Sequence, residues 1–141
     1  MIWQITASFH GLLTRTFERL GSLHLCVWAF GQLWRVDRHL QALATDALKA
    51  VPSNSKLLNQ EQEQEIKRRV AAIAWTARHH PCNPKCLHQS MVLYQWLHKQ
   101  GIAARLEVGW SDIGHAWVSY NDRVLNDNPD VAKSSPPLIK I

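Results

Sequence analysis

The apolar residues of this 141-residue chain change their spacing at Gly101, which limits the folds that the chain can adopt. Before Gly101 they recur every three or four positions, the spacing of an amphipathic helix. After Gly101 they recur every second position, the spacing of a half-buried strand. Helices followed by strands predict an α+β fold, in which helices pack against one small antiparallel sheet.

The N-terminal third of the chain predicts a helical region. Apolar side chains recur there at helical spacing, and Gly21 and Gly31 are expected to break the helix or to allow a close approach. Residues 52–55 (Pro-Ser-Asn-Ser) are typical of a loop, so we place a boundary between an N-terminal helical region, 1–52, and a second domain, 53–141. Two interpretations of the first region stay open, namely extra core for a small domain or an apolar surface on which a partner docks.

Two further helices are expected in the second domain. One starts at Asn59, which forms a capping-box pattern with Gln62, and ends near residue 80, before a proline. The other opens at Cys86 and continues to Gln100, after which Gly101 suits a helix C-cap.

The segment after Gly101 predicts an antiparallel meander. Strands are expected at 103–110, 115–120 and 123–127, with a turn at 111–114 between the first two. The tail, 128–141, holds three prolines and is expected to be irregular.

Three residues at the ends of these elements have side chains suited to nucleophilic catalysis. Cys86 lies in the first turn of a helix, where free N–H groups and the helix dipole favour a thiolate, the nucleophilic form of the side chain. His115 opens a strand and can act as the general base, and Asp127 ends the next strand and can orient the imidazole. Taken singly, each has a plainer interpretation, since a lone cysteine is usually a small buried hydrophobe and an aspartate after a strand a turn residue.

The register of the second hairpin decides whether His115 and Asp127 share a face of the sheet. A two-residue loop at Asn121 and Asp122 would put Asp127 on the face opposite His115, because side chains alternate along a strand. We therefore predict a three-residue loop, 121–123, or a bulge that shifts the register by one.

Charge and cysteine content restrict the partners and the compartment. Sixteen Lys and Arg against eleven Asp and Glu give a formal charge of +5, but the basic residues are scattered and we expect no nucleic-acid partner. The longest apolar stretch, 23–34, falls short of the ~20 residues that span a bilayer. Arg15 follows the first apolar stretch instead of preceding it, which is the wrong order for a secretory signal. Three cysteines, an odd number, favour a reduced, cytoplasmic protein.

A zinc site is an alternative use of the residues around the predicted nucleophile. His and Cys, the usual zinc ligands, crowd into ten positions: His79, His80, Cys82, Cys86 and His88. No second Cys or His pair follows at a useful distance, so we expect neither a metal nor another cofactor.

Several short motifs, in this order, resemble those of the leader peptidases of lasso peptide biosynthesis, which are small transglutaminase-like (papain-like) cysteine proteases. The similarity covers about residues 62–127. The segments that carry it are Pro84–Leu93, Leu97–Leu106, Gly109, His115–Val118 and Val124–Asp127.

The resemblance implies roles for three residues: Cys86 as nucleophile, His115 as base and Asp127 as the third member of the triad. It implies a helix bearing the nucleophile packed on a small antiparallel sheet. It also implies a reaction, removal of the leader from a ribosomally made precursor peptide, and a separate ATP-using cyclase similar to asparagine synthetase. Residues before Pro52 are too few and lack a strand pattern for a fused leader-recognition (RRE) domain, so we expect the free-standing form that works with a separate recognition protein.

Two other functions remain open on the sequence. The same three residues can pass an acyl group to an amine instead of water, because a fold does not fix the reaction. A non-catalytic module could use the apolar N-terminal helices and the basic surface to hold a peptide.

Overall fold

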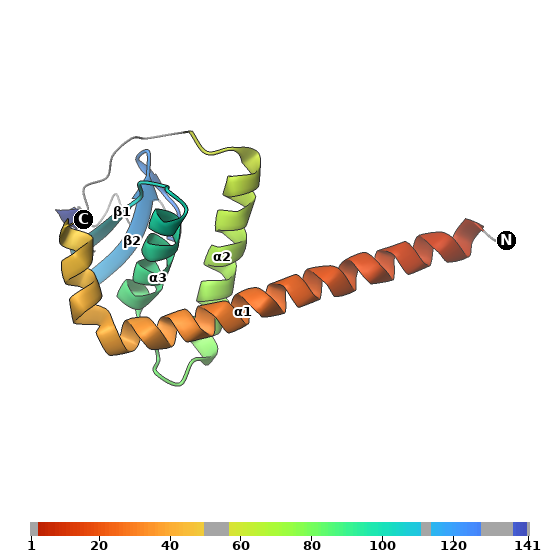
Figure 1. Cartoon of the computed structure of the whole chain (residues 1–141), viewed down its shortest axis with the longest axis horizontal. Coiled ribbons are helices and arrows are strands. Elements are labelled where there is room, and N and C mark those ends of the chain that lie inside the picture. The colour runs from red at the N-terminus through yellow and green to blue at the C-terminus, as the bar shows by residue number, and fades with distance from the viewer. Residues whose placement is uncertain (1–2, 50–56, 111–113, 128–136, 141) are drawn as a thin grey trace.

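The computed structural model describes residues 3–49, 57–110, 114–127 and 137–140, and it has the predicted α+β architecture. Figure 1 shows α2 and α3 side by side, α1 crossing them, and the sheet against α3. The elements are α1 (Trp3–Lys49), α2 (Gln60–His79), α3 (Cys86–Lys99), β1 (Arg105–Trp110), β2 (Gly114–Tyr120), β3 (Arg123–Val124) and β4 (Pro137–Lys140).

The long helix α1 bends at His39 and not at its glycines. His39 has non-helical backbone angles (φ −124°, ψ 18°), and beyond it the helix turns along the body of the molecule (Figure 1). The expectation that Gly21 or Gly31 breaks the helix or allows a close approach is wrong, because the helix continues through both and nothing lies within 4 Å of where their Cβ atoms would be. A glycine costs a helix only about 1 kcal/mol, which neighbouring residues can offset.

The predicted starts and ends of α2 and α3 are confirmed. The N–H of Asn59 donates to Gln62 Oε1 (3.0 Å), and the N–H of Gln62 donates to Asn59 Oδ1 (2.7 Å), which completes the capping box. Gly101 has φ +74°, the left-handed conformation that ends a helix at low cost in glycine.

The sheet has the order β3-β2-β1-β4, and α3 packs on one of its faces. The register of β1 and β2 pairs Leu106 with Val118 and Gly109 with His115. Leu106 and Val118 are fully buried in the core beneath α3. Because side chains alternate along β2, His115 and Trp117 belong to the opposite face.

Part of the tail is a strand, so the expectation that it is irregular throughout is wrong for residues 137–140. This strand, β4, pairs antiparallel with β1, with Val108 opposite Ile139. A proline is tolerated at the first position of an edge strand, where Pro137 lies, because no ladder hydrogen bond is lost there. The remaining tail residues, and positions 111–113 of the predicted turn, lie outside the described part of the chain, while Gly114 belongs to β2.

The second hairpin has a two-residue loop, so the predicted three-residue loop is wrong. Tyr120 pairs with Arg123, and between them Asn121 (φ 49°) and Asp122 (φ 59°) both adopt left-handed backbone angles. Asparagine and aspartate tolerate these angles better than most residues, which makes the tight turn accessible. The predicted strand 123–127 is also shorter than expected, because β3 ends at Val124.

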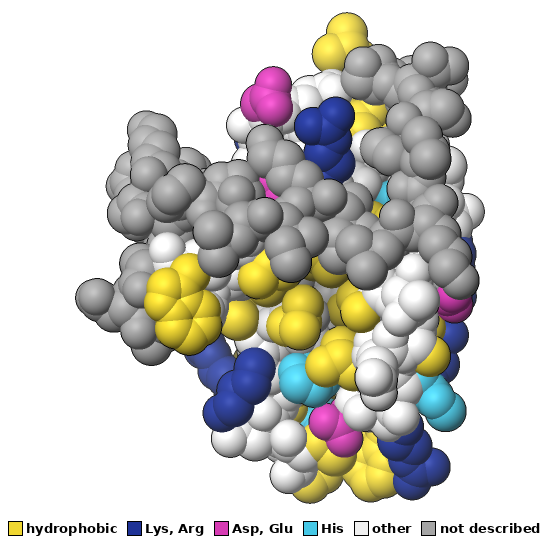
Figure 2. Space-filling view, turned by 90° about the vertical axis from the view of Figure 1, so that its left-hand side faces the viewer, with side chains coloured by type: hydrophobic (Ala, Val, Ile, Leu, Met, Phe, Trp, Pro, Cys, Tyr) yellow, Lys and Arg dark blue, Asp and Glu magenta, His cyan; other side chains and the backbone are white. Residues whose placement is uncertain are grey.

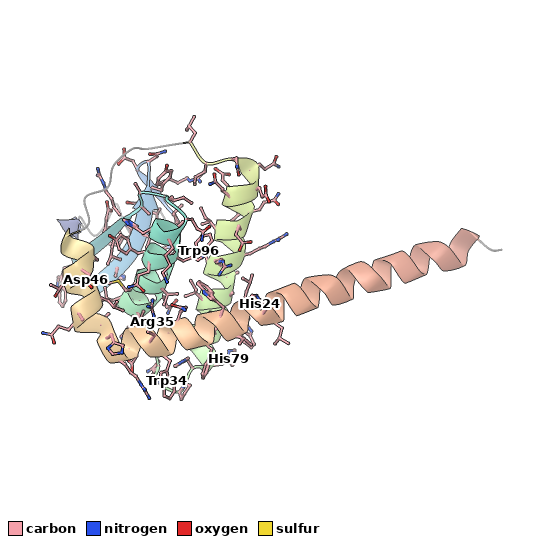
Figure 3. The ribbon with its side chains drawn as sticks, viewed as in Figure 1. His24, Trp34, Arg35, Asp46, His79 and Trp96 are labelled. Carbon is pink, nitrogen blue, oxygen red and sulfur yellow. The ribbon has the colours of Figure 1, made fainter. Side chains whose placement is uncertain are left out.

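The C-terminal half of α1 lies in the same core as the rest of the fold. Ala29, Leu33 and Val36 are fully buried in one cluster with residues of α2, α3 and the sheet. The guanidinium of Arg69 lies over the rings of Trp28 (4.3 Å) and Trp96 (4.7 Å) and so joins α1, α2 and α3. Figure 3 shows Arg35 and Trp96 between these helices. The proposed boundary at residue 52 falls outside the described residues.

None of the helices in the described part of the chain is long and apolar enough to cross a membrane.

Candidate active site

Cys86 is the first residue of α3 and is partly buried. Lys85 precedes it as the N-cap, with extended backbone angles, and the Lys85 N–H donates to Nδ1 of His88 at 3.2 Å. The first N–H groups of a helix have no partner inside it, so their positive ends favour an anion near Cys86. The helix therefore begins at the residue that the sequence predicts as the nucleophile.

The Cys86 side chain lies against the beginning of β2. Its sulfur is 3.9 Å from the carbonyl oxygen of Gly114, the residue before His115. Among the described residues, the hydrogen-bond partner of the thiol is this carbonyl and not the His115 imidazole. The fold thus brings Cys86 to the backbone beside His115, without a sulfur–imidazole bond.

Asp127 lies beyond β3 and is exposed. The chain leaves the sheet after Leu125, whose N–H donates to the Val118 carbonyl at 2.8 Å. Asp127 lies outside the strand, so strand alternation does not decide which way it points. The two-residue loop also removes the reason for placing Asp127 on the same face as His115. Its assignment rests on the resemblance alone.

Two polar side chains from other segments bond to backbone groups of β2, and the sequence analysis singled out neither of them. Ser90 Oγ donates to the Ala116 carbonyl (3.0 Å), and Asn126 Oδ1 accepts from the Val118 N–H (2.7 Å). The Asn126 Nδ2 group also donates to Ser90 Oγ (3.0 Å). The available signal was Ser90 itself, a polar residue in an apolar helix stripe that is fully buried in the structure.

The loop that leads into α3 is anchored to α1 by His80. The ring of this buried histidine packs on Phe30, with 4.3 Å between centroids, and its Nε2 is 3.3 Å from the Phe30 carbonyl. The Cys82 N–H donates to the His80 Nδ1 atom (3.2 Å). These contacts assign the neutral tautomer with hydrogen on Nε2, because Nδ1 has to accept.

Asp37 of α1 contacts both the loop and the first turn of α3. Its Oδ1 is 3.4 Å from His88 Nε2. Desolvation raises the pKa of the Cys82 thiol, and the negative charge of Asp37 and its hydrogen bond with that thiol raise it further, against a smaller opposing effect of Arg38. Because a raised pKa reduces the thiolate fraction, Cys82 is a weak candidate for a nucleophile.

The histidines considered for zinc have ring nitrogens engaged by protein groups. His79 Nδ1 is 2.9 Å from the Trp75 carbonyl, while His80 and His88 have the partners given above. Within the described segments, no three His, Cys, Asp or Glu side chains are grouped so that they could hold a metal ion.

A groove of about 1040 Å³ lies between α1 and α2, at a distance from the predicted triad. Leu23, Arg68 and Trp75 are among its lining residues, and Cys86, His115 and Asp127 are not. Figure 2 shows another face of the molecule, on which hydrophobic side chains gather and Lys and Arg lie at several places around them.

A comparison with protein families matches residues 26–139 to the transglutaminase-like superfamily. The matched segment contains Cys86, His115 and Asp127 and begins inside α1. Comparisons with curated proteins and with solved structures gave no match.

Proposed function

We propose, since the chain belongs to the transglutaminase-like superfamily, that it is a cysteine endopeptidase that removes the leader from a lasso precursor peptide. Membership supports a function of the cysteine protease or acyltransferase type. The peptidase and its substrate are inferred from the motif resemblance. The observation that carries the proposal is the position of Cys86, at the N-terminus of α3 and 3.9 Å from the residue before His115.

The proposed reaction begins with attack of the Cys86 thiolate on the carbonyl carbon that ends the leader. His115 takes the thiol proton and later gives a proton to the amine that leaves with the core peptide. A water molecule then hydrolyses the thioester, releasing the leader acid and restoring the thiol. The Cys86 N–H, at the open end of α3, is the proposed donor to the oxyanion.

This mechanism requires His115 to approach the sulfur more closely than it does in the structure. Catalytic hydrogen bonds are often long before substrate binds. His115 belongs by alternation to the face of β2 opposite α3, so its imidazole has to move around the start of β2, where the Gly114 carbonyl lies beside the thiol, to reach the sulfur. Asp127 is proposed to orient the imidazole.

The proposed partners are the leader of the precursor, a separate leader-recognition (RRE) protein and an asparagine-synthetase-like cyclase. A reduced cytoplasmic location is part of the proposal, and the three free cysteines, Cys26, Cys82 and Cys86, support it. The groove between α1 and α2 and the exposed side chains of Leu23, Val27 and Trp75 are candidate surfaces for a partner.

The test is to incubate the protein with a precursor peptide and a recognition protein from a lasso gene cluster and to measure product masses. We expect a free leader and a free core peptide, and intact precursor with Cys86→Ala. Cleavage at the wild-type rate by Cys86→Ala would reject the mechanism, and the matched control is Cys82→Ser, which removes a thiol that the proposed mechanism does not use.

The runner-up is acyl transfer to an amine, which the superfamily assignment favours equally. Added primary amine discriminates the two reactions, because transfer yields a leader amide and hydrolysis yields a leader acid. A non-catalytic peptide-binding module is the third possibility, and an electrophilic peptide that labels Cys86 stoichiometrically would reject it.

A further inference from the structure

The three segments that carry the predicted triad are joined by one chain of hydrogen bonds. The Asn126 amide, next to Asp127, donates to the Ser90 hydroxyl (3.0 Å) and accepts from the Val118 N–H (2.7 Å). The Ser90 hydroxyl donates in turn to the Ala116 carbonyl, next to His115, at 3.0 Å. These hydrogen bonds therefore connect α3, β2 and the segment after β3.

The hydrogen-bond roles in this network are fixed by the groups at its ends. Asn126 must direct its oxygen to the Val118 N–H, because that group only donates, and this leaves its NH₂ facing Ser90. The Ser90 hydroxyl then accepts from Asn126 and donates to Ala116. Ser90 has no exposed surface, so water cannot replace a partner that is lost.

These hydrogen bonds also fix how α3 lies along β2. Cys86 and Ser90 are one helical turn apart, and the β2 carbonyls that they contact, at Gly114 and Ala116, are two residues apart. These carbonyls point to the same edge, since backbone groups alternate along a strand. Any slide of α3 along this edge would break the Ser90 bond and change the Cys86 contact together.

We propose that Ser90 and Asn126 are positioning residues that hold the Cys86 helix, the His115 strand and the Asp127 segment in one arrangement. The inference rests on the proposed function. It adds Ser90 and Asn126 as residues that keep the triad segments in place and do not contact the substrate. A buried polar network can also stabilise a fold without affecting a reaction. The test therefore measures a property of Cys86 that a loss of stability alone does not change.

The experiment measures the alkylation rate of Cys86 by iodoacetamide, from about pH 5 to about pH 9, with peptide mass spectrometry to separate Cys86 from Cys26 and Cys82. In Ser90→Ala we expect the rate of Cys86 alkylation to fall about tenfold while the rate of Cys26 stays unchanged, because a displaced α3 alters the surroundings of the Cys86 thiol. Alanine is a good helix former, so this variant is expected to fold, and circular dichroism checks it. We expect Asn126→Ala to behave in the same way.

Asn121→Gly is the matched control, because it removes an amide from the same hairpin at a left-handed position that glycine accepts. With precursor peptide, kcat should fall about tenfold in Ser90→Ala while KM stays near the wild-type value. An unchanged Cys86 profile and kcat in folded Ser90→Ala would overturn the positioning role. If the wild-type Cys86 reacts no faster than Cys26 near neutral pH, the proposed function itself fails.

Discussion

Glu107 and Trp117 face each other across β1 and β2, and the indole N–H of Trp117 donates to the Glu107 carboxylate at 2.8 Å. Trp117 is fully buried and Glu107 is 9% exposed. A buried carboxylate needs such donors, because burying a charge without a partner is costly. The pair stabilises β2 two residues from His115, on the face of the sheet that His115 shares by alternation.

Removing the indole N–H of Trp117 should lower stability more than neutralising the carboxylate of Glu107. We expect Trp117→Phe to lower the free energy of unfolding by about 1–3 kcal/mol, because the carboxylate loses a buried donor. Glu107→Gln keeps an acceptor oxygen and should cost less. Urea unfolding of both variants measures the difference, and an equal loss in the two would contradict the explanation.

The three predicted catalytic residues should contribute unequally to precursor cleavage. Cys86→Ala and His115→Ala should each reduce kcat/KM by about 10⁴-fold or more, since either change stops formation of the thioester. Asp127→Ala should retain more activity, because an orienting residue takes no direct part in bond making. Rates come from mass spectrometry of the released leader, and wild-type cleavage by His115→Ala would exclude its role as base.

The two-residue hairpin loop predicts a stabilising substitution. Asp122 has φ +59°, a conformation that glycine adopts without strain, so Asp122→Gly should raise the free energy of unfolding by about 0.5–1 kcal/mol. Asp122→Val should lower it, because a β-branched side chain is strained there. Thermal unfolding monitored by circular dichroism is sufficient, and destabilisation by the glycine variant would argue for a different loop.

Arg69 should be important for holding the three helices together. Its guanidinium lies over Trp28 and Trp96 and pairs with Glu65 at 2.9 Å. Arg69→Met should cost about 1–2 kcal/mol, and Arg69→Lys should not restore it, because an ammonium cannot stack as a planar guanidinium does. The exposed neighbour Arg68 is the control, and Arg68→Met should change stability by less than about 0.5 kcal/mol.

Tyr94 should make stability fall at alkaline pH. Burial raises the pKa of its hydroxyl, so the unfolded chain loses this proton at lower pH than the folded chain does. Below a pH of about 10, the pKa of tyrosine in the unfolded chain, Tyr94 is protonated in both states and stability does not depend on its titration. Above this pH the unfolded chain ionises first, so the free energy of unfolding falls as pH rises. Tyr94→Phe lacks this titration. Urea unfolding should therefore show the stability of the variant increasing relative to wild type between about pH 9 and about pH 11.

At neutral pH the same variant should cost little. The Tyr94 hydroxyl is 3.5 Å from the Ala47 carbonyl, which is a long hydrogen bond, and phenylalanine keeps the buried ring. A variant that loses stability in parallel with wild type across this pH range would show that Tyr94 does not titrate differently in the folded chain.

Local features of the sequence predicted the helices and much of the sheet. The capping box of Asn59 and Gln62, the Gly101 C-cap and the change to a two-residue period are all set by neighbours in the chain, so they gave the correct ends of α2 and α3 and the positions of β1 and β2. The helix start at Cys86 was predictable for the same reason.

Features that depend on distant segments were not predictable in this way. The pairing of β4 with β1 and the hydrogen bond of Asn126 with Ser90 both involve partners far along the chain. The two-residue loop is a different case, since Asn121 and Asp122 indicated it, and a preference for Asp127 on the His115 face led to the wrong register.

The sequence by itself therefore determined the types of most elements, the cysteine at a helix start and the membership of a superfamily, because period, capping and motif are written in neighbouring residues. Only the tertiary structure decided that Cys86 lies against Gly114 and that Ser90 and Asn126 link the three segments. Those contacts arise when α3 packs on the sheet, since burial requires each polar group there to find a partner from another element.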